Sequence, residues 1–258
     1  MLLSNQQRSY IQQVIKTSLK QKFASYEPKD NYKPFHFKLL GEDRLALHSF
    51  MHSLLTTFGT SVFEPVAVAL AKNNFREVKT HYIVGDEIFS NCQQKITEIV
   101  NDLTVGGIPN KLENLKLLKK HLSGKMNKVK TTVVDLYVED INGELYLFDL
   151  KTVKPNKGNF EQFKQTLLTW AGILYTKNKN VQVNTLLGIT YNPYFPGEYK
   201  TWTMRAMIDT NHELKVGEQF WDFLGGEGAY NVLLDCFEQA GIELRPEIDE
   251  YFARFNRR

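Results

Sequence analysis

Two aspartates and one lysine stand out in the middle of the chain, because they occupy positions where a β-strand favours apolar side chains. Asp135 lies in one apolar segment, and Asp149 and Lys151 lie in the next. The Asn142-Gly143 pair between the segments is typical of a β-hairpin turn. Two carboxylates and an ammonium group on one sheet are suited to holding a divalent cation and hydrolysing a phosphodiester. The segment therefore predicts a metal-dependent hydrolytic site.

The length of the turn decides whether the two carboxylates can cooperate. A two-residue turn at Asn142-Gly143 would place Asp149 on the opposite face of the sheet from Asp135, because side chains alternate along a strand. A three-residue loop over 141–143, with the glycine left-handed, sets the two aspartates directly opposite one another. A bulge in the shorter hairpin would restore the same parity. We expect the three-residue loop, because two adjacent carboxylates need a cation to coexist.

The expected cation is Mg²⁺, with Mn²⁺ as a substitute, because hard cations take oxygen ligands and keep several waters. Lys151 follows Asp149 by two residues, so both side chains lie on one face of the strand. Beside two carboxylates we expect this lysine to stay protonated and to stabilise growing negative charge. The alternative is a structural pair of strand acids neutralised by lysines. Against it, unpaired carboxylates in apolar surroundings are costly.

The elements expected around the hairpin predict an α/β fold with a mixed sheet sandwiched by helices. Strands over 131–138, 144–153 and 181–191 with a helix over 160–175 make the kernel of such a sheet. A further strand is expected over 199–207, and short helices over 217–256.

The N-terminal part of the chain predicts a helical layer. Helices are expected over 5–26, 42–58, 62–73, 87–103 and 111–122. Gly59 would end the second of them, and Asp86 would cap the fourth. We expect a single domain over 1–258, with the helical layer over about 1–125, the catalytic α/β core over about 126–210 and the last helices over about 211–258.

Composition excludes few classes of protein. The chain has 258 residues, of which 42% are hydrophobic and 24% are charged, as in an ordinary globular protein. No segment reaches the roughly 20 apolar residues of a membrane span, and the N-terminus turns polar too soon for a signal peptide. Cys92 and Cys236 are expected to be reduced. These features predict a cytoplasmic protein that does not enter a membrane.

The net charge of +3 does not by itself indicate a nucleic-acid partner. The lysines are unevenly placed, however, with seven in 111–130 against the single acid Glu113. A solvated helix face and a phosphate-facing surface explain this run equally well.

The spacing of the hairpin residues resembles a known nuclease signature. Asp135, thirteen intervening residues and then Asp149-Leu150-Lys151 resemble the Asp form of the PD-(D/E)XK motif. The segment 48–67 resembles the N-terminal helix pair of type II restriction endonucleases, and 148–160 is similar to the TdeIII-type family. The likeness covers residues from about 40 to 210. Val134 replaces the proline of the motif's name, as often happens in that superfamily.

The resemblance implies a homodimeric, Mg²⁺-dependent enzyme that cuts double-stranded DNA at a short palindrome, with GGNCC as the suggested site. It implies that the carboxylate of Glu64 and the backbone carbonyl of Leu150 join Asp135 and Asp149 around the metal. Glu64 has an equally supported structural alternative, the satisfaction of N–H groups in a first helical turn. A prokaryotic host and a cognate DNA methyltransferase, as a genetic partner, are also implied.

Several polar residues are candidates for contacting DNA. Lys154, Lys157 and Asn159 follow the second hairpin strand, where contact with phosphates is more expected than base reading. Asn159 has the alternative of capping the next helix. Lys72 follows the helix of Glu64 and is expected to clamp the DNA backbone. Arg205 is a candidate for reading guanine in the major groove.

Two rival functions share parts of this pattern. A nuclease of DNA repair or recombination would use the same site without sequence specificity. A non-catalytic DNA-binding protein would keep the site as a relic, against which the three intact residues argue. A small-molecule enzyme is not supported, because neither a phosphate-binding glycine loop nor a nucleophile motif is present.

Overall fold

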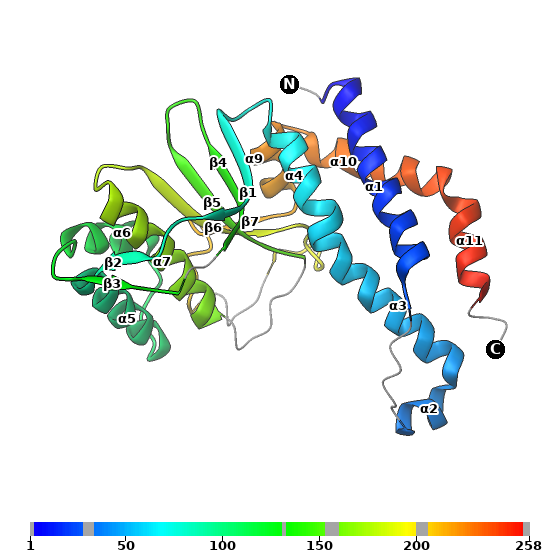
Figure 1. Ribbon diagram of the computed structural model, residues 1–258, viewed down its shortest axis with the longest axis horizontal. Helices are drawn as coiled ribbons and strands as arrows, with labels where there is room; N and C mark the ends of the chain where they lie inside the picture. The colour runs from blue at the N-terminus through cyan, green and yellow to red at the C-terminus, as the bar shows by residue number, and fades with distance from the viewer. Residues whose placement is uncertain (1–2, 28–33, 131–132, 153–159, 200–205, 255–258) are drawn as a thin grey trace.

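A five-stranded mixed sheet forms the centre of the computed structural model, which describes residues 3–27, 34–130, 133–152, 160–199 and 206–254. The strand order is β1-β4-β5-β6-β7 (Figure 1). The β1–β4 and β4–β5 pairs are antiparallel, and the β5–β6 and β6–β7 pairs are parallel. The bounds are β1 Glu77–Ile83, β4 Val133–Glu139, β5 Leu145–Lys151, β6 Val183–Ile189 and β7 Leu214–Val216.

Helices cover both faces of this sheet (Figure 1). One layer consists of α1 (Asn5–Ser25), α4 (Glu64–Ala71), α9 (Glu218–Gly225) and α10 (Ala229–Glu243). The other consists of α5 (Ser90–Thr104), α6 (Lys111–Lys120) and α7 (Phe160–Lys177), together with the small sheet of β2 (Glu87–Phe89) and β3 (Met126–Lys128). Leu136 and Phe148 enter the hydrophobic core under the first layer, and Tyr137 and Leu147 enter the core under the second. The predicted α/β sandwich with an N-terminal helical region is confirmed.

A long helix replaces the predicted break at Gly59. Helix α3 (Glu42–Phe58) continues through the π-helical turn Gly59–Phe63 directly into α4. Pro65 has no N–H to donate, and its ring would clash with a carbonyl of the preceding turn in a regular helix. The wider π turn, in which the Glu64 N–H bonds to the Gly59 carbonyl, accommodates this proline. The prediction that Gly59 ends a helix was therefore wrong.

The far half of α3 projects away from the sheet and carries α2 (Pro34–Leu40) at its end (Figure 1). An aromatic cluster joins α3 to α1 and to α11 (Arg245–Ala253), with the rings of Phe23 and Tyr251 stacked at 4.5 Å. The combined helix Glu42–Ala71 is long and apolar enough to cross a membrane by length and composition alone. This is weak evidence for a span, because 44% of its apolar window is buried inside the protein.

Other sequence predictions met mixed outcomes. Helices α9, α10 and α11 occupy the C-terminal part of the described chain, where short helices were expected. At the other end, Ser4 caps α1 and forms a capping box with Gln7. Residues 87–89 form strand β2, so the predicted helix begins later, at Ser90. Strand β1 was not predicted. The strand expected over 199–207 falls mostly outside the described residues.

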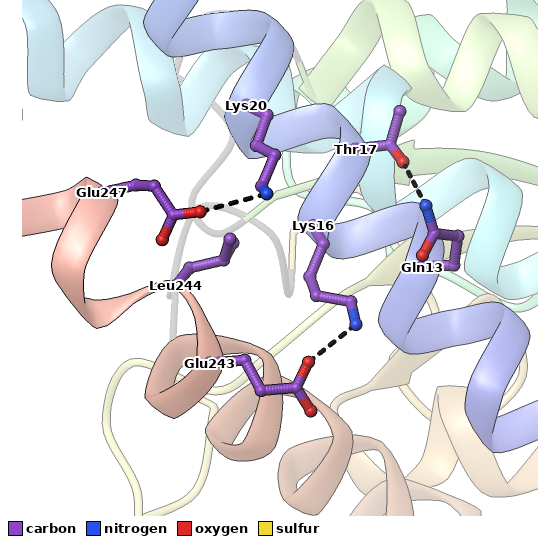
Figure 2. Close-up of a pocket in the computed structure, with 7 residues that line it drawn as sticks. All are labelled: Gln13, Lys16, Thr17, Lys20, Glu243, Leu244 and Glu247. Atoms are coloured by element: carbon purple, nitrogen blue, oxygen red, sulfur yellow. Dashed lines mark hydrogen bonds and ion pairs between the residues drawn. The ribbon is translucent and has the colours of Figure 1, made fainter.

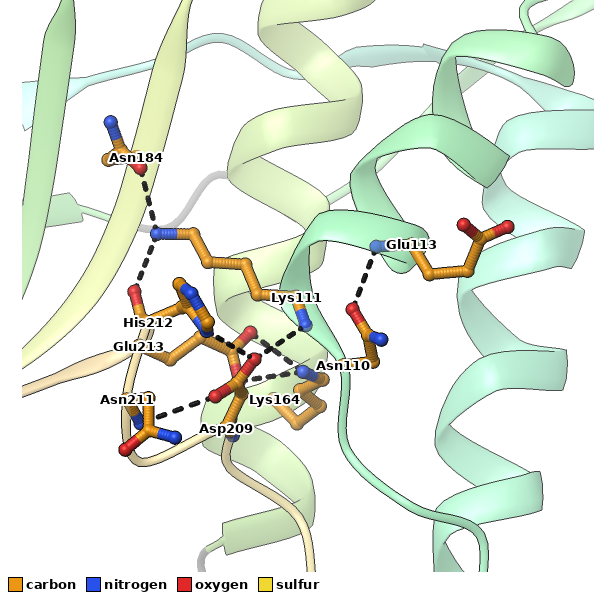
Figure 3. Close-up of polar contacts among 9 residues, drawn as sticks. All are labelled: Asn110, Lys111, Glu113, Lys164, Asn184, Asp209, Asn211, His212 and Glu213. Carbon is orange, nitrogen blue, oxygen red and sulfur yellow. Dashed lines mark hydrogen bonds and ion pairs between the residues drawn. The ribbon is translucent and has the colours of Figure 1, made fainter.

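The lysines of 111–130 do not share one face. Lys111 is 1% exposed, and its Nζ donates to Asn184 Oδ1 at 3.1 Å and to the His212 carbonyl at 2.8 Å (Figure 3). Burial lowers the pKa of Lys111 to about 8, and the negative charge of Glu213 opposes that shift. At least this lysine is a structural residue of the interior.

A second buried lysine completes this polar cluster. Lys164 of α7 is fully buried, and its Nζ donates to both carboxylate oxygens of Glu213 at 2.7 and 2.8 Å. The Asp209 N–H donates to the same carboxylate, and Asp209 in turn accepts the Lys111 N–H (Figure 3). Helices α6 and α7 are thereby fastened to the segment that precedes β7.

Candidate active site

The β4–β5 hairpin has the three-residue loop that the sequence predicts. Leu136 pairs with Phe148, and the register continues to Glu139 and Leu145. The Asp140 N–H then bonds to the Glu144 carbonyl, which leaves 141–143 as the loop.

The loop is held by two local features. Gly143 has φ +81°, a left-handed conformation that glycine adopts without steric strain. The Asp140 side chain accepts the N–H groups of Asn142 and Glu144 at 2.9 and 2.8 Å. These hydrogen bonds of the Asp140 side chain were not predicted, although aspartate at a turn is a common signal for them.

The same register, extended by one residue, sets Asp135 opposite Asp149. The two side chains are within hydrogen-bonding reach of one another, and Asp135 Oδ2 accepts the Leu150 N–H at 2.8 Å. Burial raises the pKa of Asp149 to about 6. Lys151 lowers it and Asp135 raises it further. The arrangement gathers more negative charge than the single nearby lysine neutralises.

Lys151 lies on the same face as Asp149, as the spacing predicts. Its Nζ contacts Asp149 Oδ1 directly. The ammonium group also lies over the Phe163 ring of α7, 5.0 Å from the ring centroid. The lysine is 28% exposed, so it reaches solvent while both contacts fix its head group.

Glu64 reaches this site from the first turn of α4. Its side chain is only 9% exposed, and burial raises its pKa. His81 of β1 lowers the pKa of Glu64, and Asp135 raises it through charge repulsion, so the two carboxylates are electrostatically coupled. His81 Nε2 lies 3.6 Å from Glu64 Oε2. His81 was not predicted as a site residue, because nothing in the sequence pattern around it marks it.

The described side chains do not form a complete set of metal ligands. Within the described residues, no three histidine, cysteine or acidic side chains are grouped closely enough to hold a metal ion. Asp135 and Asp149 meet, whereas Glu64 stands near them without closing the group. This donor set still fits a hard cation of the Mg²⁺ type, which binds through few carboxylates and keeps several waters.

Most of the predicted DNA contacts lie outside the described residues, namely Lys154, Lys157, Asn159 and Arg205. Lys72 is described and is exposed at the end of α4.

A surface hollow lies elsewhere, between α1 and the α10–α11 junction (Figure 2). Ion pairs from Lys16 to Glu243 and from Lys20 to Glu247, at 2.7 and 3.1 Å, bridge it. These ion pairs join α1 to α10 and α11, and none of the residues that line the hollow belongs to the hairpin site.

A match to a known family covers most of the chain. Residues 3–241 match the family described as "Type II restriction endonuclease, HinfI". The chain belongs to the HinfI family of type II restriction endonucleases. The finer resemblance to the TdeIII-type family and to the PD-(D/E)XK motif stays a prediction.

Curated relatives of this HinfI-family chain are restriction enzymes. It is 30% identical to the type II restriction enzyme MjaII of Methanocaldococcus jannaschii over 225 residues, which is 82% of this chain and 59% of MjaII. The chain thus spans about three-fifths of the length of MjaII. It is 25% identical to HgiCII and 24% identical to HgiEI, both type II restriction enzymes of Herpetosiphon aurantiacus. The matches cover 84% and 94% of this chain, and 80% and 93% of the two relatives.

Proposed function

We propose that this protein is a type II restriction endonuclease that hydrolyses phosphodiesters of double-stranded DNA at a short palindromic site. One observation carries the proposal: Asp135 and Asp149 face one another on the sheet, with the Lys151 ammonium beside them. Family membership supports it, because type II restriction endonucleases generally use divalent metal ions and act on DNA. The presence of all three groups argues against a relic site.

The cation would be held by Asp135, Asp149 and the backbone carbonyl of Leu150, with Glu64 as a further carboxylate. Mg²⁺ suits these oxygen donors, and Mn²⁺ is the expected substitute. When bound, the cation polarises a phosphoryl oxygen and lowers the pKa of a water molecule. The hydrogen bond from the Leu150 N–H fixes the orientation of the Asp135 carboxylate before any metal arrives.

The ammonium group of Lys151 would stabilise the negative charge that grows on the phosphate during attack. Its contacts with Asp149 and with the Phe163 ring hold it in place, which reduces the reorganisation needed in the transition state. A neutral side chain of the same length would lack this charge.

The DNA would be bound by Lys72 together with Lys154, Lys157, Asn159 and Arg205. A homodimer is proposed, because a two-fold palindrome is most simply read by a two-fold assembly. The site GGNCC is the candidate that the TdeIII-type resemblance suggests. A prokaryotic cytoplasm and a cognate methyltransferase that protects the host DNA complete the proposal.

Digestion of one DNA of known sequence, followed by sequencing of the fragment ends, tests this function. With Mg²⁺ present we expect discrete fragments whose ends share one short palindrome, and with a chelator present we expect none. Random degradation would instead favour the rival repair nuclease. Intact DNA under every metal condition would favour a non-catalytic protein.

A further inference from the structure

His81 has an unusual backbone conformation for a residue inside a strand. Its neighbours Thr80 and Tyr82 pair with Leu136 and Val134 of β4, so His81 lies at the register position opposite Asp135. Its φ is +52°, the left-handed region, which side-chain-bearing residues rarely adopt. Among the described residues other than glycine, it is the one with a positive φ.

The left-handed conformation interrupts the strand at a specific place. The β1–β4 pairing is recorded on both sides of His81 but not at His81 itself. Such a conformation is strained and persists where its surroundings over-determine it, often at functional sites. We therefore looked for a side-chain contact of His81 that depends on this backbone conformation.

That contact is with a buried carboxylate. His81 Nε2 lies 3.6 Å from Glu64 Oε2, a polar contact slightly longer than a hydrogen bond. The histidine is 66% exposed, whereas Glu64 is 9% exposed. His81 is thus a polar group on the solvent side of a carboxylate that is otherwise enclosed by the apolar core around α4.

We propose that His81 is a positioning residue that holds the Glu64 carboxylate turned toward Asp135 and Asp149, so that a third acid is available to the cation. The inference rests on the proposed function. Partners of this kind, which bind a ligand side chain and not the metal, change metal affinity by about 10- to 100-fold. The left-handed backbone of β1 is what directs the imidazole to that contact.

The test uses His81→Gly and His81→Gln in the full chain. Glycine tolerates the left-handed region, so a structural role for His81 predicts a lower Tm and the proposal predicts an unchanged or higher Tm. Mg²⁺ affinity is measured by calorimetry, and the Mg²⁺ concentration for half-maximal DNA cleavage is measured beside it. We expect His81→Gly to lower the Mg²⁺ affinity, and to raise the Mg²⁺ concentration for half-maximal cleavage, each by about 10-fold or more. His81→Gln keeps an N–H donor and should recover part of the loss.

Lys79→Ala is the matched control, because Lys79 is exposed on the same strand and pairs with Glu77, away from the hairpin acids. It should change neither Mg²⁺ measurement. Unchanged Mg²⁺ dependence in His81→Gly would overturn the proposal whatever its Tm. A His81→Gln variant no better than His81→Gly would also overturn it.

Asp149→Asn separates this inference from the function on which it rests. If Asp149→Asn cleaves DNA normally, the proposed site itself is wrong. If Asp149→Asn is inactive while His81→Gly depends on Mg²⁺ as the wild type does, only the role of His81 fails.

Discussion

Asp149 lies opposite Asp135 across the β4–β5 hairpin, and the two side chains are within hydrogen-bonding reach. Two carboxylates this close cannot both ionise cheaply, and the charge of Asp135 raises the pKa of Asp149. Burial adds to this effect and raises the pKa of Asp149 to about 6. A bound cation removes the conflict, because it stabilises both ionised forms at once.

Neutralising Asp149 should therefore stabilise the metal-free protein. The raised pKa means that the folded state disfavours the charged form, so Asp149→Asn should raise the Tm at about pH 8 without Mg²⁺. Thermal unfolding with and without Mg²⁺ measures this, and the ion should stabilise the wild type but not the variant. Glu87→Gln, at an exposed acid on β2, is the control. A lower Tm for Asp149→Asn would contradict the argument.

The increase in Tm that Asp149→Asn causes in the metal-free protein should also depend on pH. Because the folded pKa of about 6 exceeds the ordinary 3.8, Asp149 contributes stability that is present at about pH 4 and is lost as the pH rises through about 6. The difference in Tm between variant and wild type should accordingly grow from about pH 4 to about pH 6 and level off at higher pH. A pH series of thermal unfolding curves checks it, and a constant difference would refute it.

Mg²⁺ affinity should fall in acid for the same reason. The cation needs ionised Asp149, so lowering the pH through about 6 should raise the Mg²⁺ dissociation constant, by up to about 10-fold per pH unit for one proton. Calorimetry at about pH 5.5, 7 and 8 gives the values. Affinity that does not change over this range would remove Asp149 from the ligands.

The loop that sets the register depends on Gly143. Its φ of +81° is costly for a residue with a side chain, so Gly143→Ala should lower the free energy of unfolding by about 1–2 kcal/mol. Gly241→Ala is a matched control, since Gly241 lies in α10 with open space around its Cα and should gain about 0.5–1 kcal/mol. Urea denaturation measures both changes. Equal effects would argue against a conformational role for Gly143.

The buried pair of Lys164 and Glu213 should be sensitive to the loss of either partner. Lys164→Met leaves the buried Glu213 carboxylate without its ion-pair partner, and should destabilise the protein by about 3–5 kcal/mol. Combining it with Glu213→Leu should restore part of that stability, because both charges are then gone. Denaturation of both single variants and the double variant decides. A double variant as unstable as the sum of the single ones would contradict this coupling.

The hairpin and the helix after it were predictable from the sequence because their signals are local. Alternation, the Asn142-Gly143 pair and the apolar stripe of α7 all lie within a few residues of the structure they specify. The opposition of Asp135 and Asp149 is different, because the local sequence fits both a two-residue and a three-residue loop. The three-residue loop was predicted from the expected metal site, and parity then sets the two aspartates opposite one another.

The failures have non-local causes. Strand β2 has only three residues and forms by pairing with β3, which lies far along the chain, so its residues looked like the start of the next helix. Lys111 was counted with a basic run, although its partners Asn184 and His212 come from distant segments. His81 is marked by its backbone conformation and by its distance from Glu64, and neither is written in the sequence around it.

The most direct test of the central claim compares the single-turnover rate of DNA cleavage by the wild type with that of Asp149→Asn in saturating Mg²⁺. Enzyme in excess over DNA makes the rate report chemistry rather than product release. The facing carboxylates predict a loss of at least about 100-fold, with folding intact by circular dichroism. Cleavage by Asp149→Asn at the wild-type rate would contradict a metal site built on this hairpin.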